Sequence, residues 1–128
     1  MALFGNPSND NRPVFLDLTK IALPITALVS ILHRVSGVGM IISLPVMIAM
    51  MYATVSSTEH YASMVAVCNT LWMKLFLLLV VSGTSYHILA GVRHSIDDFV
   101  GSHSLQTARI TAKFVLGIWL VLVVLFVR

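Results

Sequence analysis

The stretch VSGVGMIISLPVMIAMMYATVSST, residues 35–58, decides the class of this protein because it contains no charged side chain. A helix needs about 20 predominantly apolar residues to cross a hydrocarbon core roughly 30 Å thick, and this run is long enough. The helix is expected to begin earlier, near Pro24, because proline suits the first turn. Pro45 lies inside the run, where a membrane helix tolerates it as a kink.

Two further apolar runs follow. The first covers about residues 66–92 and is interrupted by Lys74, which can extend its ammonium group to the interface. The second, residues 114–127, is short but reaches a spanning length when the preceding turn is added and Lys113 also extends outward. An interfacial helix is the alternative for this last segment. We favour a span because the segment is apolar on all sides. The sequence thus predicts an all-α membrane protein with three transmembrane helices, at about residues 24–56, 64–94 and 107–127, in a single anchor domain of residues 1–128 with an N-terminal segment 1–23.

The composition supports a membrane protein and excludes several other classes. Of 128 residues, 58% are hydrophobic and 10% are charged, and the mean hydropathy is +0.94, which a soluble globule of this size could not accommodate. The net charge of +3 comes from scattered Lys and Arg residues that form no patch for nucleic acid. Cys68 is the one cysteine, which excludes a disulfide framework and a CxxC metal site, and we interpret it as a packing residue.

The beginning of the chain gives an expectation about the cellular compartment. The first twenty residues have no basic segment before an apolar core, as a signal peptide would, and are too acidic and too poor in Arg for a mitochondrial transit peptide. There is no nucleotide-binding loop or dinucleotide fingerprint. We therefore expect a mature bacterial inner-membrane protein that acts in or beside the bilayer with partner proteins.

The distribution of basic residues predicts how the helices are oriented. Of the eight Lys and Arg residues, six lie before the first span or flank the second loop, and two lie at the other side. The side richer in basic residues is normally cytoplasmic, so we expect a cytoplasmic N-terminus. The six are Arg12, Lys20, Arg34, Arg93, Arg109 and Lys113; the two are Lys74 and Arg128.

His87 is the most deeply placed titratable residue of the second predicted span. It precedes Arg93 by six residues, which places it roughly 9 Å inside that interface at about 1.5 Å per residue. Gly83 and Gly91 lie one turn to either side on the same face and would leave room for a helix or a flat ring. His87 therefore fits two interpretations: a hydrogen bond to a neighbouring helix, or an axial ligand of haem iron.

An electron-transfer haem usually has two strong axial ligands, and the sequence offers no obvious second one. His33 and His94 are expected at the interface, His60 at the opposite face and His103 in a loop. If His87 binds haem iron, the second ligand should come from another subunit.

The stretch SILHRVSG, residues 30–37, places three polar side chains within one helical turn. Ser30 and Arg34 are i,i+4 neighbours and His33 is at i+3, so all three can point to one side. In one interpretation Arg34 reaches lipid phosphates and Ser30 bonds its own helix. In the other they form a polar pocket for a quinone, whose carbonyl oxygens need donors and whose reduction develops negative charge. Haem propionates would favour His33 and Arg34 for the same electrostatic reason.

A group of mixed charge, Arg93, His94, Asp97 and Asp98, lies at the end of the second span. Arg93 and Asp97 are i,i+4 neighbours, and so are His94 and Asp98. We interpret Asp97 as part of a solvated helix end with ion pairs, which contribute little stability. For His94 and Asp98 the alternatives are a proton path or a docking surface for a cytoplasmic subunit.

Two motifs together resemble the cytochrome b subunit of succinate dehydrogenase, respiratory complex II. SILHRVSG (residues 30–37) fits the pattern S-x-x-H-R-x-S/T-G, and HILAGVRHSIDD (residues 87–98) fits H-x-x-x-G-x-R-H-x-x-x-D. RPVFLDL (residues 12–18) and PITALVS (residues 24–30) are also similar to the bacterial proteins. The resemblance covers most of the chain from Arg12 to about Asp98, and the third span agrees in position and character.

The resemblance implies an enzyme of four subunits in which this chain is the larger of two membrane anchors. A flavoprotein would oxidise succinate, an iron–sulfur subunit would carry the electrons, and the anchors would hold haem b and reduce ubiquinone. No succinate-oxidising site would lie in this chain. Alternatives are the anchor of a fumarate reductase, a non-redox membrane assembly subunit or a small transporter component.

The resemblance also implies roles for six residues. His87 would be one axial haem ligand, with the other from the second anchor subunit. Ser30 and Arg34 would contact ubiquinone, and Asp98 would belong to the polar network of the quinone pocket. His33, Arg34 and His94 would lie near the haem propionates.

Overall fold

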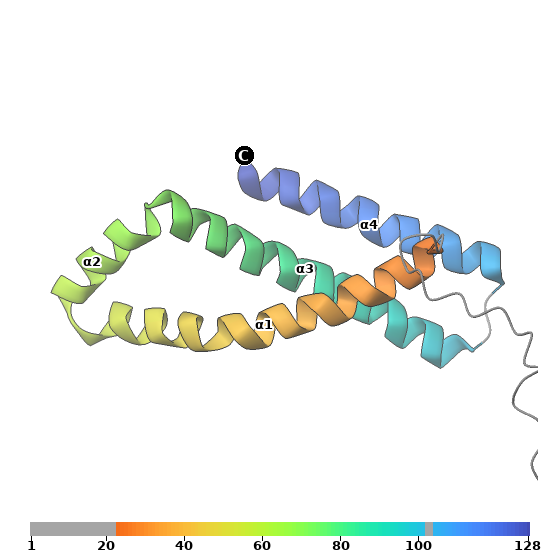
Figure 1. Cartoon of the computed structure of the whole chain (residues 1–128), viewed down its shortest axis with the longest axis horizontal. Coiled ribbons are helices and arrows are strands. Elements are labelled where there is room, and N and C mark those ends of the chain that lie inside the picture. The colour runs from red at the N-terminus through yellow and green to blue at the C-terminus, as the bar shows by residue number, and fades with distance from the viewer. Residues whose placement is uncertain (1–22, 102–103) are drawn as a thin grey trace, which may run out of the picture.

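The computed structural model describes residues 23–101 and 104–128. They form four helices (Figure 1): α1 Ile25–Ser56, α2 Thr58–Cys68, α3 Leu71–Val100 and α4 Leu105–Val127. α1, α3 and α4 are long and apolar enough to cross a membrane, which confirms the predicted helical membrane bundle with three spans. Three features used above lie outside the described residues: almost all of the N-terminal segment with its similarity over residues 12–18, the basic residues Arg12 and Lys20, and His103.

α1 agrees with the first predicted helix. Its N-cap is Pro24, which has an extended backbone, and its 32 residues continue through Pro45. At about 1.5 Å per residue the helix is roughly 48 Å long, longer than a hydrocarbon core is thick. It ends where Ser57 adopts an extended conformation.

The second predicted helix, residues 64–94, is wrong at both ends. Residues 58–68 form the separate short helix α2, because the Ser57 hydroxyl accepts from the His60 amide and Thr70 caps the start of α3 in the same way. At its other end α3 continues to Val100 and stops at Gly101, whose φ of 81° only glycine adopts readily. The charged residues at the predicted end lie inside the last turns of the helix.

The three long helices meet in one small core. α1 crosses α3, and α4 packs against α3 and the beginning of α1 (Figure 1). The small residues Ala90 and Ala112 are fully buried and allow the helices to approach closely. The remaining buried apolar side chains are Val29, Tyr86 and Val115.

Polar contacts between the helices fix this packing. The Tyr86 hydroxyl donates to the Val29 carbonyl at 2.9 Å and joins α3 to α1. The Trp119 indole N–H donates to the Ser82 carbonyl at 3.0 Å and joins α4 to α3. The Tyr86 and Trp119 rings meet edge to face with centroids 5.5 Å apart. The Tyr86 hydroxyl and the Trp119 indole N–H thereby have hydrogen-bond partners inside the bundle, where no water is available.

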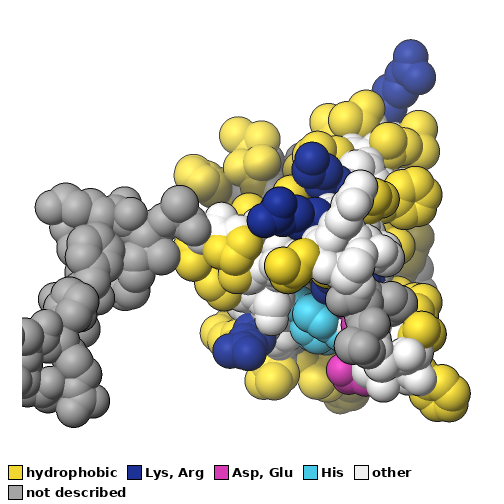
Figure 2. Space-filling view, turned by 90° about the vertical axis from the view of Figure 1, so that its right-hand side faces the viewer, with side chains coloured by type: hydrophobic (Ala, Val, Ile, Leu, Met, Phe, Trp, Pro, Cys, Tyr) yellow, Lys and Arg dark blue, Asp and Glu magenta, His cyan; other side chains and the backbone are white. Residues whose placement is uncertain are grey.

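Most of the charged residues in the described part of the chain gather at one end of the bundle. The beginning of α1, the end of α3 and the beginning of α4 lie together there (Figure 1). Viewed from this end, Lys and Arg side chains lie around His and acidic side chains (Figure 2). We call this the polar end of the molecule; it carries the residues for which functions were predicted.

Candidate functional site

His87 on α3 contacts α1 where the two helices cross. Its ring stacks on that of His33, with centroids 4.1 Å apart and an interplanar angle of 20°. Both side chains are partly buried. The sequence analysis expects His33 at the interface and His87 deeper in the membrane. This expectation is wrong, because the crossing of α1 and α3 brings the two histidines to the same level.

The Nδ1 atom of His87 lies between two oxygen atoms of α1. It is 3.1 Å from the His33 carbonyl oxygen and 3.1 Å from the Ser36 Oγ. The Ser36 hydroxyl is in turn 2.8 Å from the same His33 carbonyl, to which it donates. One carbonyl, one hydroxyl and one imidazole nitrogen thus form a compact polar group.

These contacts determine the tautomer of His87. A carbonyl can only accept, and the Ser36 proton is directed at that carbonyl, so both oxygens present lone pairs to Nδ1. Nδ1 must therefore carry the proton, and the lone pair of the neutral ring resides on Nε2. No hydrogen bond among the described residues occupies Nε2. A histidine held through Nδ1–H with a free Nε2 is the usual form of a metal-binding imidazole.

Three glycines surround the histidine pair, and they differ in the space beside them. A Cβ placed on Gly37 would lie 3.0 Å from the His87 Cε1, and one on Gly91 would lie 3.3 Å from the His33 Nε2. Beside Gly83 no atom lies within 4 Å. The predicted open strip along α3 is therefore open on the Gly83 side, whereas the His33 ring fills the Gly91 side.

A cavity of about 450 Å³ adjoins this open side. α1 and α3 supply most of its walls, which are almost entirely apolar. Gly39 and Gly83 widen it, since a Cβ on either would meet no atom within 4 Å. Ser36 lines it as well, so the cavity begins at the residue that contacts His87. The space is apolar with few polar groups, as ligand pockets usually are.

His33 and His87 would not hold one metal between them in this arrangement. Two imidazoles that hold one metal each direct a ring nitrogen at it. Here the two imidazoles lie face to face with centroids 4.1 Å apart, so their nitrogens do not point at a shared centre. No group of three or more His, Cys, Asp or Glu residues in the described part of the chain could hold a metal ion by itself.

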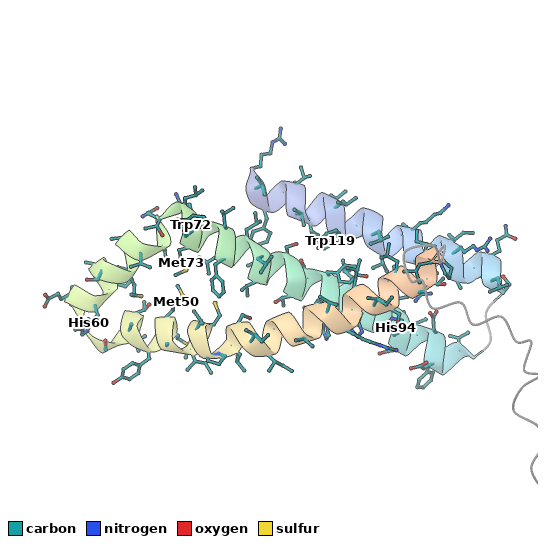
Figure 3. The ribbon with its side chains drawn as sticks, viewed as in Figure 1. Met50, His60, Trp72, Met73, His94 and Trp119 are labelled. Atoms are coloured by element: carbon teal, nitrogen blue, oxygen red, sulfur yellow. The ribbon has the colours of Figure 1, made fainter. Side chains whose placement is uncertain are left out.

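His94 extends the histidine cluster toward the polar end. Its ring is tilted by 48° to that of His33, with centroids 5.3 Å apart. Its Nε2 is buried and has no hydrogen-bond partner among the described residues. A side-chain view shows His94 near the beginning of α1 and His60 in α2 at the far end (Figure 3), which agrees with the predicted location of His60.

Ser30, His33 and Arg34 differ in their exposure on α1. His33 faces α3, Ser30 is half-buried and Arg34 is exposed. Asp98 is also exposed, and no ion pair or hydrogen bond within the described residues joins it to His94. The structure therefore brings together His33, His87 and His94, and it leaves Arg34 and Asp98 on the surface of the polar end.

Arg93 is buried and joins α3 to α4. Its guanidinium donates to the Thr111 hydroxyl at 3.0 Å and to the Ala108 carbonyl at 3.3 Å. It also forms an ion pair with Asp97 at 3.1 Å, as the i,i+4 spacing predicts. Within the mixed-charge group, Arg93 and its partner Asp97 thus have a structural role.

The comparison with known proteins decides the family. Residues 8–126 match the family described as Succinate dehydrogenase/Fumarate reductase transmembrane subunit. This chain belongs to that family. The resemblance inferred from the two motifs is thereby confirmed, and the protein is a multi-pass membrane subunit.

Individual relatives support this family membership. The chain is 35% identical over 118 residues to the succinate dehydrogenase cytochrome b556 subunit of Coxiella burnetii, covering 91% of this chain and 94% of that protein. It is 30% identical over 125 residues to the cytochrome b556 subunit of Paracoccus denitrificans, with the same coverage. It is 25% identical over 122 residues to the cytochrome b560 subunit of Reclinomonas americana, covering 86% and 80%.

Two residues of this transmembrane subunit have contacts that sequence reasoning did not predict. Ser36 and Gly37 close the SILHRVSG motif, and both face the His87 ring. The signal was present in the family pattern, which ends in S/T-G at these positions. The structure explains these two positions of the pattern, because the crossing of α1 and α3 places the His87 ring against Ser36 and Gly37.

Proposed function

We propose that this chain is a membrane anchor of a succinate:ubiquinone oxidoreductase that holds a b-type haem through His87 and contributes to the site of ubiquinone reduction. The supporting observation is the His87 imidazole itself. Its Nδ1 is held by two oxygens of α1, its Nε2 is free of protein hydrogen bonds, and an apolar cavity of about 450 Å³ begins beside it.

The donor set fits a haem. A neutral imidazole nitrogen suits haem iron, and Gly83 leaves room beside it for a flat ring. When bound, a b haem supplies a one-electron redox centre. The buried and unpartnered Nε2 of His94 and the exposed guanidinium of Arg34, with His33, could donate to its carboxylates at the polar end.

The second axial ligand would come from a second small anchor subunit. The stacked geometry of His33 and His87 excludes His33 from that role, and His60 lies at the far end. The cytochrome b names of the relatives support a b-type haem in this chain as well. The other partners would be a flavoprotein subunit and an iron–sulfur subunit, which passes electrons to the anchor.

Ubiquinone would bind at the polar end near Ser30 and Arg34. A hydroxyl and a guanidinium are donors for the quinone carbonyls, and the fixed positive charge of Arg34 would stabilise negative charge that develops on the ring. Asp98 would belong to the polar surroundings and is exposed to take up protons from the aqueous side. This polar end would face the cytoplasm of a bacterium, with the chain in the inner membrane and its N-terminus cytoplasmic.

The same anchor could serve electron flow in the opposite direction. The family comprises succinate dehydrogenase and fumarate reductase subunits. The direction follows from the potentials of the cofactors and the quinone, and the donors described here would bind either form of the quinone. Succinate oxidation is favoured because the relatives are named as succinate dehydrogenase subunits.

The haem assignment is tested by the visible spectrum of the complete complex. We expect the reduced b-type band to disappear in His87→Ala, because no other imidazole in the described chain is oriented to replace it. His60→Ala is the matched control, since His60 bonds only serines at the far end, and it should retain the band. A band that persists in His87→Ala would reject the assignment and favour a non-redox assembly subunit.

The quinone assignment is tested by separating the two half-reactions. Ser30→Ala and Arg34→Ala should lower ubiquinone reduction about 10-fold or more, as loss of a charge-stabilising donor does. Succinate oxidation with a soluble dye acceptor should remain, because that reaction occurs in other subunits. Full ubiquinone turnover in both variants would exclude these residues from the site.

A further inference from the structure

We infer that Ser36 and Gly37 are positioning residues for His87 that fix its tautomer and its approach to α1, and thereby set the redox potential of the haem. This inference rests on the proposed role of His87 as a haem ligand. It concerns two neighbouring residues of α1 that lie against the imidazole.

Ser36 acts through its hydroxyl. The hydroxyl donates to the His33 carbonyl at 2.8 Å and presents a lone pair to the His87 Nδ1 at 3.1 Å. It thus stabilises the Nδ1–H tautomer and also fixes the rotation of the ring. A hydrogen bond that polarises Nδ1–H makes the opposite nitrogen a stronger donor, which stabilises the oxidised metal and lowers its potential.

Other serines of α1 show that the second contact of Ser36 is not a by-product of helix geometry. Ser43 donates to the Met40 carbonyl at 2.9 Å, the same i−3 bond, and contacts no histidine. Ser56 donates to the Ala53 carbonyl at 2.9 Å and lies 3.1 Å from the His60 Nδ1, but this pair is exposed at the far end. Serines in membrane helices commonly bond their own backbone. At Ser36 this common bond is combined with a contact to a deep imidazole.

Gly37 acts by the absence of a side chain. A Cβ there would lie 3.0 Å from Cε1 of His87, closer than carbon atoms normally approach, and 3.5 Å from its Nδ1, which is an ordinary contact distance. Alanine would therefore push the ring outward by a few tenths of an ångström and lengthen both Nδ1 contacts. By contrast, a Cβ on Gly117 of α4 would meet nothing within 4 Å.

The experiment is a redox titration of the haem in the purified four-subunit complex, followed by its visible band. We expect Ser36→Ala and Ser36→Val to raise the midpoint potential, and Ser36→Thr to keep it near that of the parent. Thr and Val have nearly the same shape, so a difference between them reports the hydroxyl alone. Ser56→Ala is the matched control and should leave the potential unchanged.

Gly37→Ala is tested in the same complex against Gly117→Ala. We expect Gly37→Ala to shift the potential or to lower the haem content per flavin, and Gly117→Ala to do neither.

The outcomes separate this inference from the proposed function. If His87→Ala loses the band while Ser36→Ala and Ser36→Val titrate as the parent or lower, the inference is wrong and the haem assignment stands. The same holds if Ser36→Thr behaves as Ser36→Val does, or if Gly37→Ala matches Gly117→Ala. A band retained in His87→Ala removes the proposed function itself.

Discussion

At the scale of single residues, Arg93 illustrates how a charge can be held near the end of a membrane helix. Its side chain is only 8% exposed, yet its donors meet Thr111, the Ala108 carbonyl and the Asp97 carboxylate. Charged groups inside a bundle are tolerated when they are paired in this way. The cost of burying the guanidinium is thus offset by contacts that also join two helices.

We expect Arg93→Ala to destabilise the anchor, because it removes both bonds to α4. Hydrogen bonds to charged groups contribute about 1.5–3 kcal/mol, so the thermal midpoint of the purified complex should fall clearly. Thr111→Val removes one acceptor and leaves the Ala108 and Asp97 contacts, and it should give a smaller decrease. Equal midpoints for Arg93→Ala and the parent would show that the other contacts of α4, including the Trp119–Ser82 hydrogen bond, hold it without Arg93.

At the scale of the helices, the open face of α3 is its functional feature. Gly83 on this face has no side chain, and it lines the cavity that begins beside His87. We expect Gly83→Leu to lower the haem content per flavin severely, since a leucine side chain would occupy the space needed by a flat ring. Gly117→Leu adds the same side chain on α4, at a residue that does not line the cavity, and should retain the haem. Normal haem content in Gly83→Leu would place the haem elsewhere.

The helices were largely predictable because charge-free runs of spanning length have few other interpretations. The sequence does not predict α2 as a separate helix, since the hydroxyl caps Ser57 and Thr70 are ordinary polar residues. The end of α3 was set too early at the first charged residues, whereas the decisive signal was Gly101.

The site was only partly predictable, because some of its features follow from one helix and others depend on how two helices cross. The depth of His87 and the open Gly83 follow from spacing along one helix. The stacking of His33 on His87, and the contacts of Ser36 and Gly37, depend on where α1 crosses α3. Likewise His33 and Arg34 are sequence neighbours, and consecutive residues of a helix point in directions about 100° apart. Only one of the two could face α3.

At the scale of the whole molecule, the described chain leaves most of its apolar side chains uncovered. Its fully buried side chains lie at a single crossing, while large residues on each of the three long helices, such as Ile41, Leu79 and Phe114, are more than two-thirds exposed. Such surfaces are stable only against lipid or other helices. The anchor therefore depends on the bilayer and on partner helices for most of its contacts.

The orientation of this assembly can be tested by labelling single cysteines. In a Cys68→Ser background, Glu59→Cys places a thiol on the exposed surface of α2, and Gln106→Cys places one at the exposed start of α4 beside the polar end. The excess of basic residues at the polar end predicts that it is cytoplasmic. In spheroplasts expressing the complete complex, a membrane-impermeant maleimide should therefore label Glu59→Cys at once and Gln106→Cys only after permeabilisation. The reverse pattern would place the polar end outside. Asp98 would then take up protons from the periplasm, and the proposed cytoplasmic location of the polar end, with Ser30 and Arg34, would be wrong.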